Sequence, residues 1–471
     1  MTNNEQDTAI AIPTKEFFVS MLTRDISLVD AILDLVDNCL DGALRTAGNN
    51  QVNYSRHSVI IKIDSDRFYI QDDCGGIPRD IARNYAFKMG REPDDSRDSE
   101  SDTIGMYGVG MKRAIFKMGR DATVRSCHNG DRYYVPISSE WLDNKEWERL
   151  PIVNGGSEVD FDNPGTIIEV KSLYPSVSRH FESDSFINDV KIAIGEHFTM
   201  FLQKGLNIKV NGELVKPVRV EVLVSDDKNG PAPYIYQKEI DGVTVSIAVG
   251  LNSTKSSNGD EETHDFERNR TAITAGWTVF CNDRAVIVGD KSRLTGWGDG
   301  IPMYHWQFSV ITGIVEFRSA SADKLPITTT KRALDTSSDV WLEARTKMRD
   351  GLRVFINHTN TWKNHPISDQ TKYWESTKPL PLAKAIEAVV AREVAKKQDG
   401  SIEYNPTKKN VLPVPETKKP SSRKIVYSRP IEEIRIVSAF LFDREDEVPG
   451  SVGDKCFQVI FERSKKNDKE Q

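Results

Sequence analysis

Three short segments in the first quarter of the chain carry side chains and glycines that could bind a nucleotide. They are Asp34–Asp41 (DLVDNCLD), Asp72–Ile77 (DDCGGI) and Ile104–Lys112 (IGMYGVGMK). Each segment alone is weak evidence. Their order predicts an acidic helix, a strand that ends in a carboxylate and glycines, a polar loop, and a glycine-rich turn that opens a second helix. Together they indicate an ATP pocket.

The first segment could supply a base and a metal ligand from one helical turn. Asp34 and Asn38 are four residues apart, so their side chains project over one patch of a helix. The amide oxygen of Asn38 could ligate Mg²⁺, which prefers oxygen ligands, and the Asp34 carboxylate could position or deprotonate a water. The alternative is a solvated acidic face, which the other two segments disfavour. Residues at helical spacing predict a face that packs on a core: Val29, Ile32, Leu33, Val36 and Leu40.

The second segment could recognise a nucleobase. Phe68–Ile70 predicts a strand that runs into Asp72, and a buried carboxylate at a strand end can accept a hydrogen bond from the adenine amino group. Glycines just after it would let the base approach the backbone closely. The alternative is an Asp-Gly turn between this strand and a helix that begins near Pro78.

The third segment could hold phosphates. Gly105, Gly108 and Gly110 precede a predicted helix from Met111, and glycines at a helix start expose backbone N–H groups and the positive end of the dipole to an anion. A Rossmann site is disfavoured because residues 91–102 are polar and acidic rather than a hydrophobic strand. That stretch predicts a mobile lid over the site, with a solvated loop as the alternative.

This arrangement resembles the GHKL ATPase superfamily of gyrase, heat-shock chaperones, histidine kinases and MutL, and the third segment is most similar to MORC proteins and the chaperones. The resemblance implies a Bergerat-type ATP-binding α/β sandwich. It places Asp34 where these families usually carry a glutamate base, Asn38 on the magnesium ligand and Asp72 on the adenine carboxylate. It implies nucleotide contacts from Asn38, Asp41, Asp72, Gly76, Gly105, Tyr107, Gly108, Val109, Gly110, Met111 and Lys112.

Two residues depart from the family pattern. Cys74 replaces the first glycine after the adenine carboxylate, so the backbone there must avoid positive φ or tolerate strain. Asp34 is one methylene shorter than glutamate, which retracts the carboxylate by about 1.5 Å. Misplacement on that scale can cost about a hundredfold in rate. We therefore expect either slow hydrolysis or binding with almost no hydrolysis.

The rest of the chain predicts further domains of an α+β protein, since its 471 residues correspond to about three domains. We predict an ATP-binding domain over 1–210, a ribosomal-S5-like transducer domain over 211–355, a helical extension over 356–398, a linker over 399–424 and a small carboxy-terminal module over 425–471. The stretch Gly276–Ile287 predicts a hairpin centred on Asn282 and Asp283. It resembles a strand–NxR–strand hairpin in the second domain of MutL and MORC proteins.

Lys331 is a second catalytic candidate. It lies in the loop Leu325–Arg332, ahead of a helix predicted from about Asp335. The resemblance implies that a lysine on such a loop contacts the γ-phosphate, where a cation would stabilise transition-state charge. The alternatives are an ordinary surface lysine or the adjacent Arg332 in the same role.

Composition limits the remaining choices. The net charge of −7 argues against a broadly basic DNA-binding surface, and no run of about 18 apolar residues offers a membrane span. The five cysteines form no CxxC pair and predict neither disulfides nor a zinc site. The first 14 residues lack the pattern of a signal peptide, so we expect a cytoplasmic protein.

The resemblance implies ATP and Mg²⁺ as cofactors and a homodimer that forms when ATP binds, with Lys15–Asp30 placed for the contact. It suggests a nucleotide-gated clamp with slow ATPase activity in DNA handling or in defence against foreign DNA. The alternatives are an ATP-binding switch with little hydrolysis and a chaperone-like remodelling factor. Histidine-kinase chemistry is disfavoured, because no helix with an acceptor histidine precedes Asp34. A protein partner for the carboxy-terminal module is a further expectation.

Overall fold

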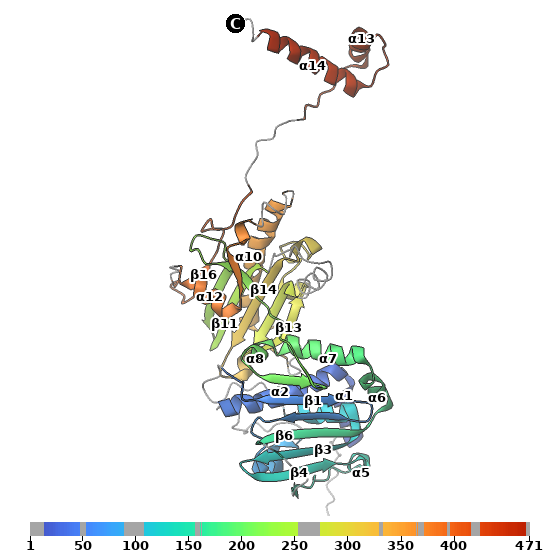
Figure 1. The fold of residues 1–471 in the computed structure, drawn as a ribbon, viewed down its shortest axis with the longest axis vertical. Coiled ribbons are helices and arrows are strands. Elements are labelled where there is room, and N and C mark those ends of the chain that lie inside the picture. The colour runs from blue at the N-terminus through green and yellow to red at the C-terminus, as the bar shows by residue number, and fades with distance from the viewer. Residues whose placement is uncertain are drawn as a thin grey trace, which may run out of the picture. The chain divides into compact units, whose positions relative to one another are not determined.

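The structure is a computed structural model, and its internal contacts divide the chain into two units, Met1–Pro415 and Glu416–Gln471. The first unit contains two large sheets, and the second contains two helices (Figure 1). The structure describes residues 14–47, 53–88, 108–155, 161, 163–252, 274–328, 333–363, 365, 372–392, 396–415 and 424–467.

The amino-terminal part of the first unit is built on an eight-stranded sheet with the order β5-β4-β3-β6-β2-β1-β7-β8. Only the β1–β7 pair is parallel, and the other neighbours are antiparallel. The elements are α1 (Lys15–Arg24), α2 (Leu28–Ala47), β1 (Ser58–Ile63), β2 (Phe68–Asp72), α3 (Arg79–Ile81), the π-helical η1 (Ala82–Ala86), α4 (Gly110–Met118), β3 (Gly119–His128), β4 (Asp131–Ile137), α5 (Ser139–Asp143), β5 (Val153–Asn154), β6 (Gly165–Leu173), α6 (Pro175–Phe181), α7 (Asp184–His197), α8 (Thr199–Gln203), β7 (Asn207–Val210) and β8 (Glu213–Leu214).

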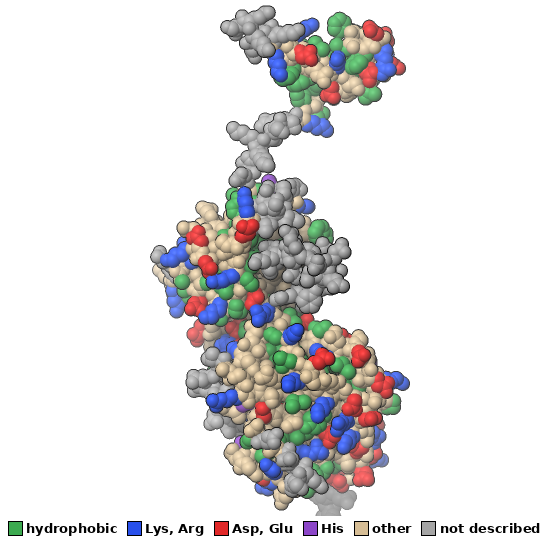
Figure 2. Space-filling model, in the orientation of Figure 1, with side chains coloured by type: hydrophobic (Ala, Val, Ile, Leu, Met, Phe, Trp, Pro, Cys, Tyr) green, Lys and Arg blue, Asp and Glu red, His purple; other side chains and the backbone are tan. Residues whose placement is uncertain are grey.

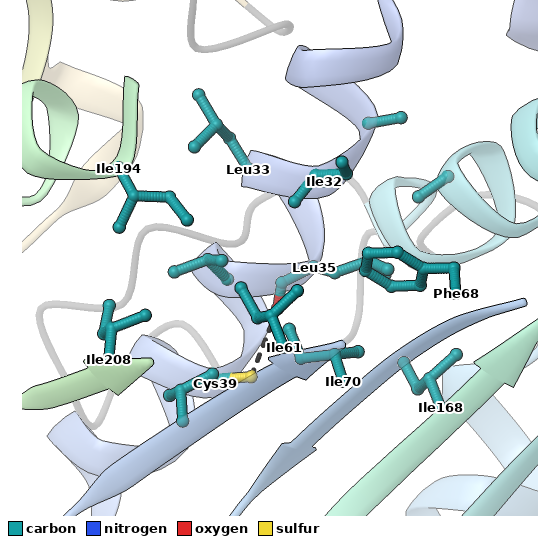
Figure 3. Packing of buried hydrophobic residues seen from close by; sticks show 14 of the residues in the cluster. Ile32, Leu33, Leu35, Cys39, Ile61, Phe68, Ile70, Ile168, Ile194 and Ile208 are labelled. Atoms are coloured by element: carbon teal, nitrogen blue, oxygen red, sulfur yellow. Dashed lines mark hydrogen bonds between the residues drawn. The ribbon is translucent and has the colours of Figure 1, made fainter. Parts of the chain in front are cut away.

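Helix α2 lies over this sheet and packs against α4 and α7. Figure 3 shows Ile32 and Leu35 of α2 in one cluster with Ile61 of β1 and Ile70 of β2, whereas Leu33 projects on the side of Ile194 of α7. The predicted helix and its core-facing stripe are therefore confirmed, although Leu35 widens the buried face beyond the predicted stripe. This packing fixes the polar side chains of α2 relative to the ends of the strands below.

The second part of the first unit is a six-stranded sheet with the order β13-β12-β14-β11-β10-β16, in which only β12 and β14 are parallel. Its elements are β9 (Val222–Ser225), β10 (Tyr234–Ile240), β11 (Val243–Leu251), β12 (Gly276–Cys281), β13 (Arg284–Asp290), η3 (Arg293–Thr295), η4 (Trp306–Phe308), β14 (Ile311–Arg318), η5 (Ala322–Lys324), α10 (Asp339–Trp362), β15 (Thr377–Leu380), α12 (Leu382–Val390) and β16 (Ile402–Tyr404), with β9 and β15 forming a separate pair.

Both faces of this second sheet are covered. Tyr234 and Tyr236 of β10 belong to the core that includes α10, whereas Ile235 between them belongs to the core that includes α12. This alternation follows from the two-residue period of a strand. The predicted hairpin is confirmed, because β12 and β13 pair antiparallel across Asn282 and Asp283. The comparison with a ribosomal-S5-like transducer stays a prediction.

Several predicted element bounds were wrong. Apolar spacing in the sequence predicts helices over Phe186–Phe201 and Leu382–Lys397 and a strand over Val218–Val224. The first of these helices is broken at Phe198, where the backbone (φ −114°, ψ 20°) ends α7 and begins α8. The predicted helix Leu382–Lys397 ends at Val390, and Arg392 then donates to the carbonyl oxygens of Gly230 and Ser225. The predicted strand Val218–Val224 starts only at Val222.

Two further elements lie across predicted boundaries. Helix α10 begins at Asp339 rather than at about Asp335, and it runs through the predicted boundary at residue 355. Strand β16 lies inside the segment predicted as a linker, where it pairs with β10 and buries Tyr404. Glu403 of β16 accepts hydrogen bonds from Tyr234 and Lys347, and these contacts stabilise the docking of this short strand.

The second unit contains α13 (Ile431–Phe442) and α14 (Pro449–Asn467). Most of its apolar side chains are exposed, including Ile436, Phe440 and Phe457, and Val452 is its one buried hydrophobic residue among those described. On the face shown in Figure 2, basic and acidic side chains are interspersed over the first unit. Among the described helices, none combines the length and the apolar content that a bilayer-spanning segment requires.

Candidate functional site

Helix α2 buries most of its acidic side chains instead of presenting them to solvent. Asp34, Asp37 and Asp41 are 5%, 0% and 6% exposed, while Asn38 is exposed. The alternative of a solvated acidic face is therefore wrong for three of the four polar residues in the first segment. Because burying a carboxylate is costly without a partner, each must be compensated. Asp34 and Asp37 form ion pairs with arginines from two different parts of the fold.

The partner of Asp34 is Arg113, in the first turns of α4. Nε of Arg113 donates to Oδ2 of Asp34 at 3.1 Å, and a second guanidinium nitrogen donates to the same oxygen. Gly110 lies close by, since a Cβ added there would be 3.7 Å from Oδ2 of Asp34. The first turn of the glycine-rich helix and the candidate base therefore meet. Sequence reasoning missed Arg113, although its position three residues after Gly110 was a usable signal.

Asp72 lies at the end of β2, and it is 8% exposed. Its Oδ1 accepts from the backbone N–H of Cys74 at 2.9 Å and from that of Thr166 at 3.3 Å. Burial raises the pKa of Asp72 to about 6, although these hydrogen bonds act in the opposite direction. Thr166, on the neighbouring strand β6, was not predicted as part of the site.

Close backbone approach explains the glycines around Asp72. A Cβ on Gly165 would lie 2.0 Å from the carbonyl oxygen of Asp72, and one on Gly76 would lie 2.2 Å from that of Cys127. The positive φ angles fall on Gly75 (96°) and Gly76 (71°), whereas Cys74 is not among the described residues with positive φ. The cysteine is therefore accommodated without backbone strain.

The described part of the third segment forms the start of α4. Gly108 has φ 63°, Val109 is the N-cap, and Gly110 and Met111 open the helix, which confirms the predicted helix start. Met111 is partly buried against the core under α2. Gly105 and Tyr107, the predicted lid and the loop residues Lys331 and Arg332 lie outside the described residues.

Lys112 is directed into the protein. It is 2% exposed, and its Nζ donates to the carbonyl oxygens of Ala86 (2.9 Å), Lys88 (2.6 Å) and Gly108. These bonds tie the end of η1 to the glycine turn before α4. In this arrangement Lys112 supports the shape of the turn, and its predicted nucleotide contact stays a prediction.

A further group of potential ligands lies beside Asp72. Donor atoms of His57, Asp73 and Cys74 are all within 4.8 Å of one another. Nδ1 of His57 is 3.8 Å from Oδ1 of Asp73, and Ser58 donates to Asp73 through its N–H and its hydroxyl. The hydrogen bond with Asp73 raises the pKa of His57. Burial alone would raise the pKa of Asp73, but its hydrogen bonds outweigh this effect and lower that pKa.

A comparison with known protein families finds a match for the region that carries this site. Residues 26–166 match the family described as histidine kinase-, DNA gyrase B-, and HSP90-like ATPase. The matched region contains all three predicted segments together with Arg113 and Thr166. The match supports the GHKL superfamily and ATP binding by this region, and the large mixed sheet fits such a domain. Compared with curated proteins, the chain gives no match.

The residues around Asp34 and those around Asp72 offer different chemistry. The exposed amide of Asn38 and the carboxylate of Asp34 offer oxygen donors of the kind that Mg²⁺ prefers. The start of α4 adds backbone N–H groups and the positive end of a helix dipole. Asp72 is a buried carboxylate at the end of β2 that accepts from the backbone N–H of Thr166. The matched region thus presents a helix start, which favours an anion, together with a buried carboxylate at a strand end.

Proposed function

We propose that the chain binds ATP with Mg²⁺ through its GHKL-type region and hydrolyses it slowly. The observation that carries the proposal is the meeting of Asp34, Arg113 and the start of α4 within a region that matches an ATPase family. Asp72 would accept from the adenine amino group, and Asn38 would hold Mg²⁺. The helix start would receive the phosphates, since its N–H groups and dipole favour an anion.

Asp34 would act on the attacking water, and two features support a low rate. Its side chain is one methylene shorter than the glutamate expected from the family resemblance. Its Oδ2 already accepts hydrogen bonds from Arg113, so the carboxylate shares its charge with a cation. Both features also favour the alternative function, an ATP-binding switch with little hydrolysis.

Phosphate release by the parent protein and by Asp34→Asn separates the two functions. We expect the variant to bind ATP as the parent does and to lose hydrolysis, because the amide cannot accept a proton. Asp64→Asn is a matched control, because Asp64 is an exposed carboxylate away from α2. Hydrolysis by Asp34→Asn at the parent rate would exclude Asp34 as the base. ATP binding without turnover by the parent would favour the switch.

The proposal includes a homodimer that forms when ATP binds, as in a clamp on DNA or on a protein client. Helix α1 supports it, because Phe17 and Met21 lie one turn apart with 61% and 49% of their surface exposed. An exposed apolar pair of this kind suits a contact surface. Light scattering should give a higher mass with a non-hydrolysable ATP analogue than with ADP. Equal masses with both nucleotides would refute the dimer.

A further inference from the structure

The hairpin β12–β13 ends in a rigid tip. Asn282 and Asp283 both have positive φ (46° and 68°), as a two-residue type I′ turn requires. Nδ2 of Asn282 donates to the carbonyl oxygen of Ser319 at 2.9 Å, and the N–H of Ser319 donates back to Oδ1 of Asn282 at 3.0 Å. These bonds attach the tip to the end of β14, so the tip moves with the six-stranded sheet.

This tip is buried against the part of the first unit that carries the eight-stranded sheet. Arg284, directly after the turn, is 0% exposed, and its Nε donates to Oδ1 of Asp37 at 2.7 Å. The ring of Phe198 lies 5.5 Å from the guanidinium carbon. The imidazole Nδ1 of His197 lies 2.6 Å from the carbonyl oxygen of Ala285 and forms a hydrogen bond with it. The hairpin therefore contacts both α2 and the α7–α8 junction.

A second ion pair crosses the same interface and joins Asp283 to Lys204, which lies after α8. Asp283 is 2% exposed, and it accepts from Nζ of Lys204 at 2.5 Å and from Arg318 at 2.6 Å. Burial of Asp283 is outweighed by these two cations, which lower its pKa. Lys204 follows α8, whereas Asp37 lies on the helix that carries the candidate catalytic groups.

Position on α2 makes the Arg284–Asp37 pair relevant to the nucleotide. Asp37 directly precedes Asn38 and comes three residues after Asp34 on the same helix. Both members of the pair are fully buried, and separating buried charges from each other is strongly unfavourable. A rotation of α2 that repositions Asn38 or Asp34 must therefore move the hairpin tip or break the pair.

We propose that Arg284 and Asp37 are positioning residues that couple nucleotide binding on α2 to the six-stranded sheet. The proposal rests on the proposed function, because it requires a nucleotide at the α2–α4 site. Binding would be transmitted through Asp37 to Arg284 and then along β12–β13 to β14. By linkage, the state of the second sheet would alter nucleotide affinity by the same factor.

Hydrogen exchange with and without a magnesium complex of a non-hydrolysable ATP analogue tests the coupling in the full chain. In the parent protein, we expect the analogue to slow exchange in Gly276–Asp290 by about tenfold. The double variant Asp37→Asn/Arg284→Gln keeps two polar partners without charge. We expect it to bind the analogue and to show protection that is confined to the eight-stranded sheet region.

Two further variants complete the design. Lys204→Gln removes the neighbouring ion pair of the same interface, and we expect it to retain the hairpin protection of the parent. Arg284→Lys keeps the charge but changes the donor geometry. We expect it to lose part of the protection, which preserves a test if the double variant fails to fold.

The possible results are distinguishable. Hairpin protection that persists in the nucleotide-bound double variant would overturn the coupling. If the double variant does not fold, hairpin protection at the parent level in Arg284→Lys would overturn it instead. An equal loss of hairpin protection in Lys204→Gln would also overturn the coupling, because the effect would then belong to the whole interface. A parent protein that binds the analogue without any change in the hairpin would overturn the coupling alone. A parent protein that does not bind it would overturn the proposed function as well.

Discussion

The two ends of the candidate nucleotide site are held by different forces. At the Asp72 end, the carboxylate accepts from two backbone N–H groups, and glycines allow the strands to approach closely. At the Asp34 end, the carboxylate is held by an arginine side chain from another helix. Backbone contacts within a sheet are fixed by the fold, whereas a side-chain ion pair can exchange partners. The Asp72 end of the candidate site is therefore preformed, and the Asp34 end is adjustable.

The largest effect should come from crowding the preformed end. Gly76→Ala adds a Cβ at φ 71° that would lie 2.2 Å from a carbonyl oxygen, whereas Gly130→Ala adds one at φ 84° with no atom within 4 Å. Both should incur the strain of a left-handed residue, about 1–3 kcal/mol. Only Gly76→Ala should lose about 1–3 kcal/mol more through overpacking.

Urea unfolding monitored by tryptophan fluorescence measures both free energies of unfolding. Because both glycines have positive φ, the difference between the variants isolates the close approach of Gly76 to β3. Equal destabilisation by the two substitutions would show that this end is not sterically fixed.

A change at the adjustable end should affect turnover more than nucleotide affinity. Arg113→Gln removes the guanidinium that holds the Asp34 carboxylate, and a displaced base can reduce the rate by roughly a hundredfold. We expect this loss of position to outweigh the gain in basicity that follows from removal of the neighbouring cation. We expect ADP affinity to change little. Arg120→Gln is the control, because Arg120 pairs with the exposed Asp143 at the surface. Steady-state phosphate release should fall only in the first variant, and equal rates in both would show that Arg113 does not position the base.

The smallest effect should be a dependence of ATP affinity on pH. Burial raises the pKa of Asp72 to about 6, so the carboxylate gains a proton as the pH falls through that value. The protonated group loses charge as an acceptor for the adenine amino group, and affinity should fall by a few-fold between about pH 7 and pH 5. In Asp72→Asn this slope should be absent. Calorimetry across this range measures both proteins, and parallel slopes would assign the titration to another group.

The raised pKa of Asp72 also predicts how the free energy of unfolding changes with pH. The change has the opposite sign to that of a carboxylate whose pKa is lowered by a partner. Because the folded protein binds the proton of Asp72 more tightly than the unfolded chain does, this group favours folding more as the pH falls from about 6 toward 4. Asp73 acts in the reverse direction, since its pKa is lowered. The contribution of Asp72 is therefore the difference between the parent and Asp72→Asn at each pH.

The sequence predicted the helices and the hairpin near the site well, because apolar spacing and turn residues are local signals. The stripe from Ile32 to Leu40 and the Asn282–Asp283 turn are of this kind. The partners of the buried acids could not be predicted in the same way. Arg113 is 79 residues from Asp34, and Arg284 is 247 residues from Asp37.

Errors in element bounds have a similar origin. The predicted helix to Lys397 continued a favourable local pattern, but Arg392 donates to carbonyl oxygens more than 160 residues away and draws the chain out of the helix. The prediction of a linker over 399–424 rests on its Pro, Lys and Ser residues, whereas β16 within it is an Ile-Glu-Tyr strand that pairs with β10. Local pattern identifies an element, and tertiary partners decide where it ends.

Calorimetric titration of the full chain with ATP and Mg²⁺ tests the central claim most directly. The design compares the parent with Asp72→Asn and with Asp73→Asn. The second variant is the control, because the Asp73 carboxylate of the parent contacts His57 and Ser58. We predict saturable binding by the parent, a loss of about tenfold or more in affinity for Asp72→Asn, and little change for Asp73→Asn. No binding by the parent, or equal dissociation constants for the parent and Asp72→Asn, would contradict the account.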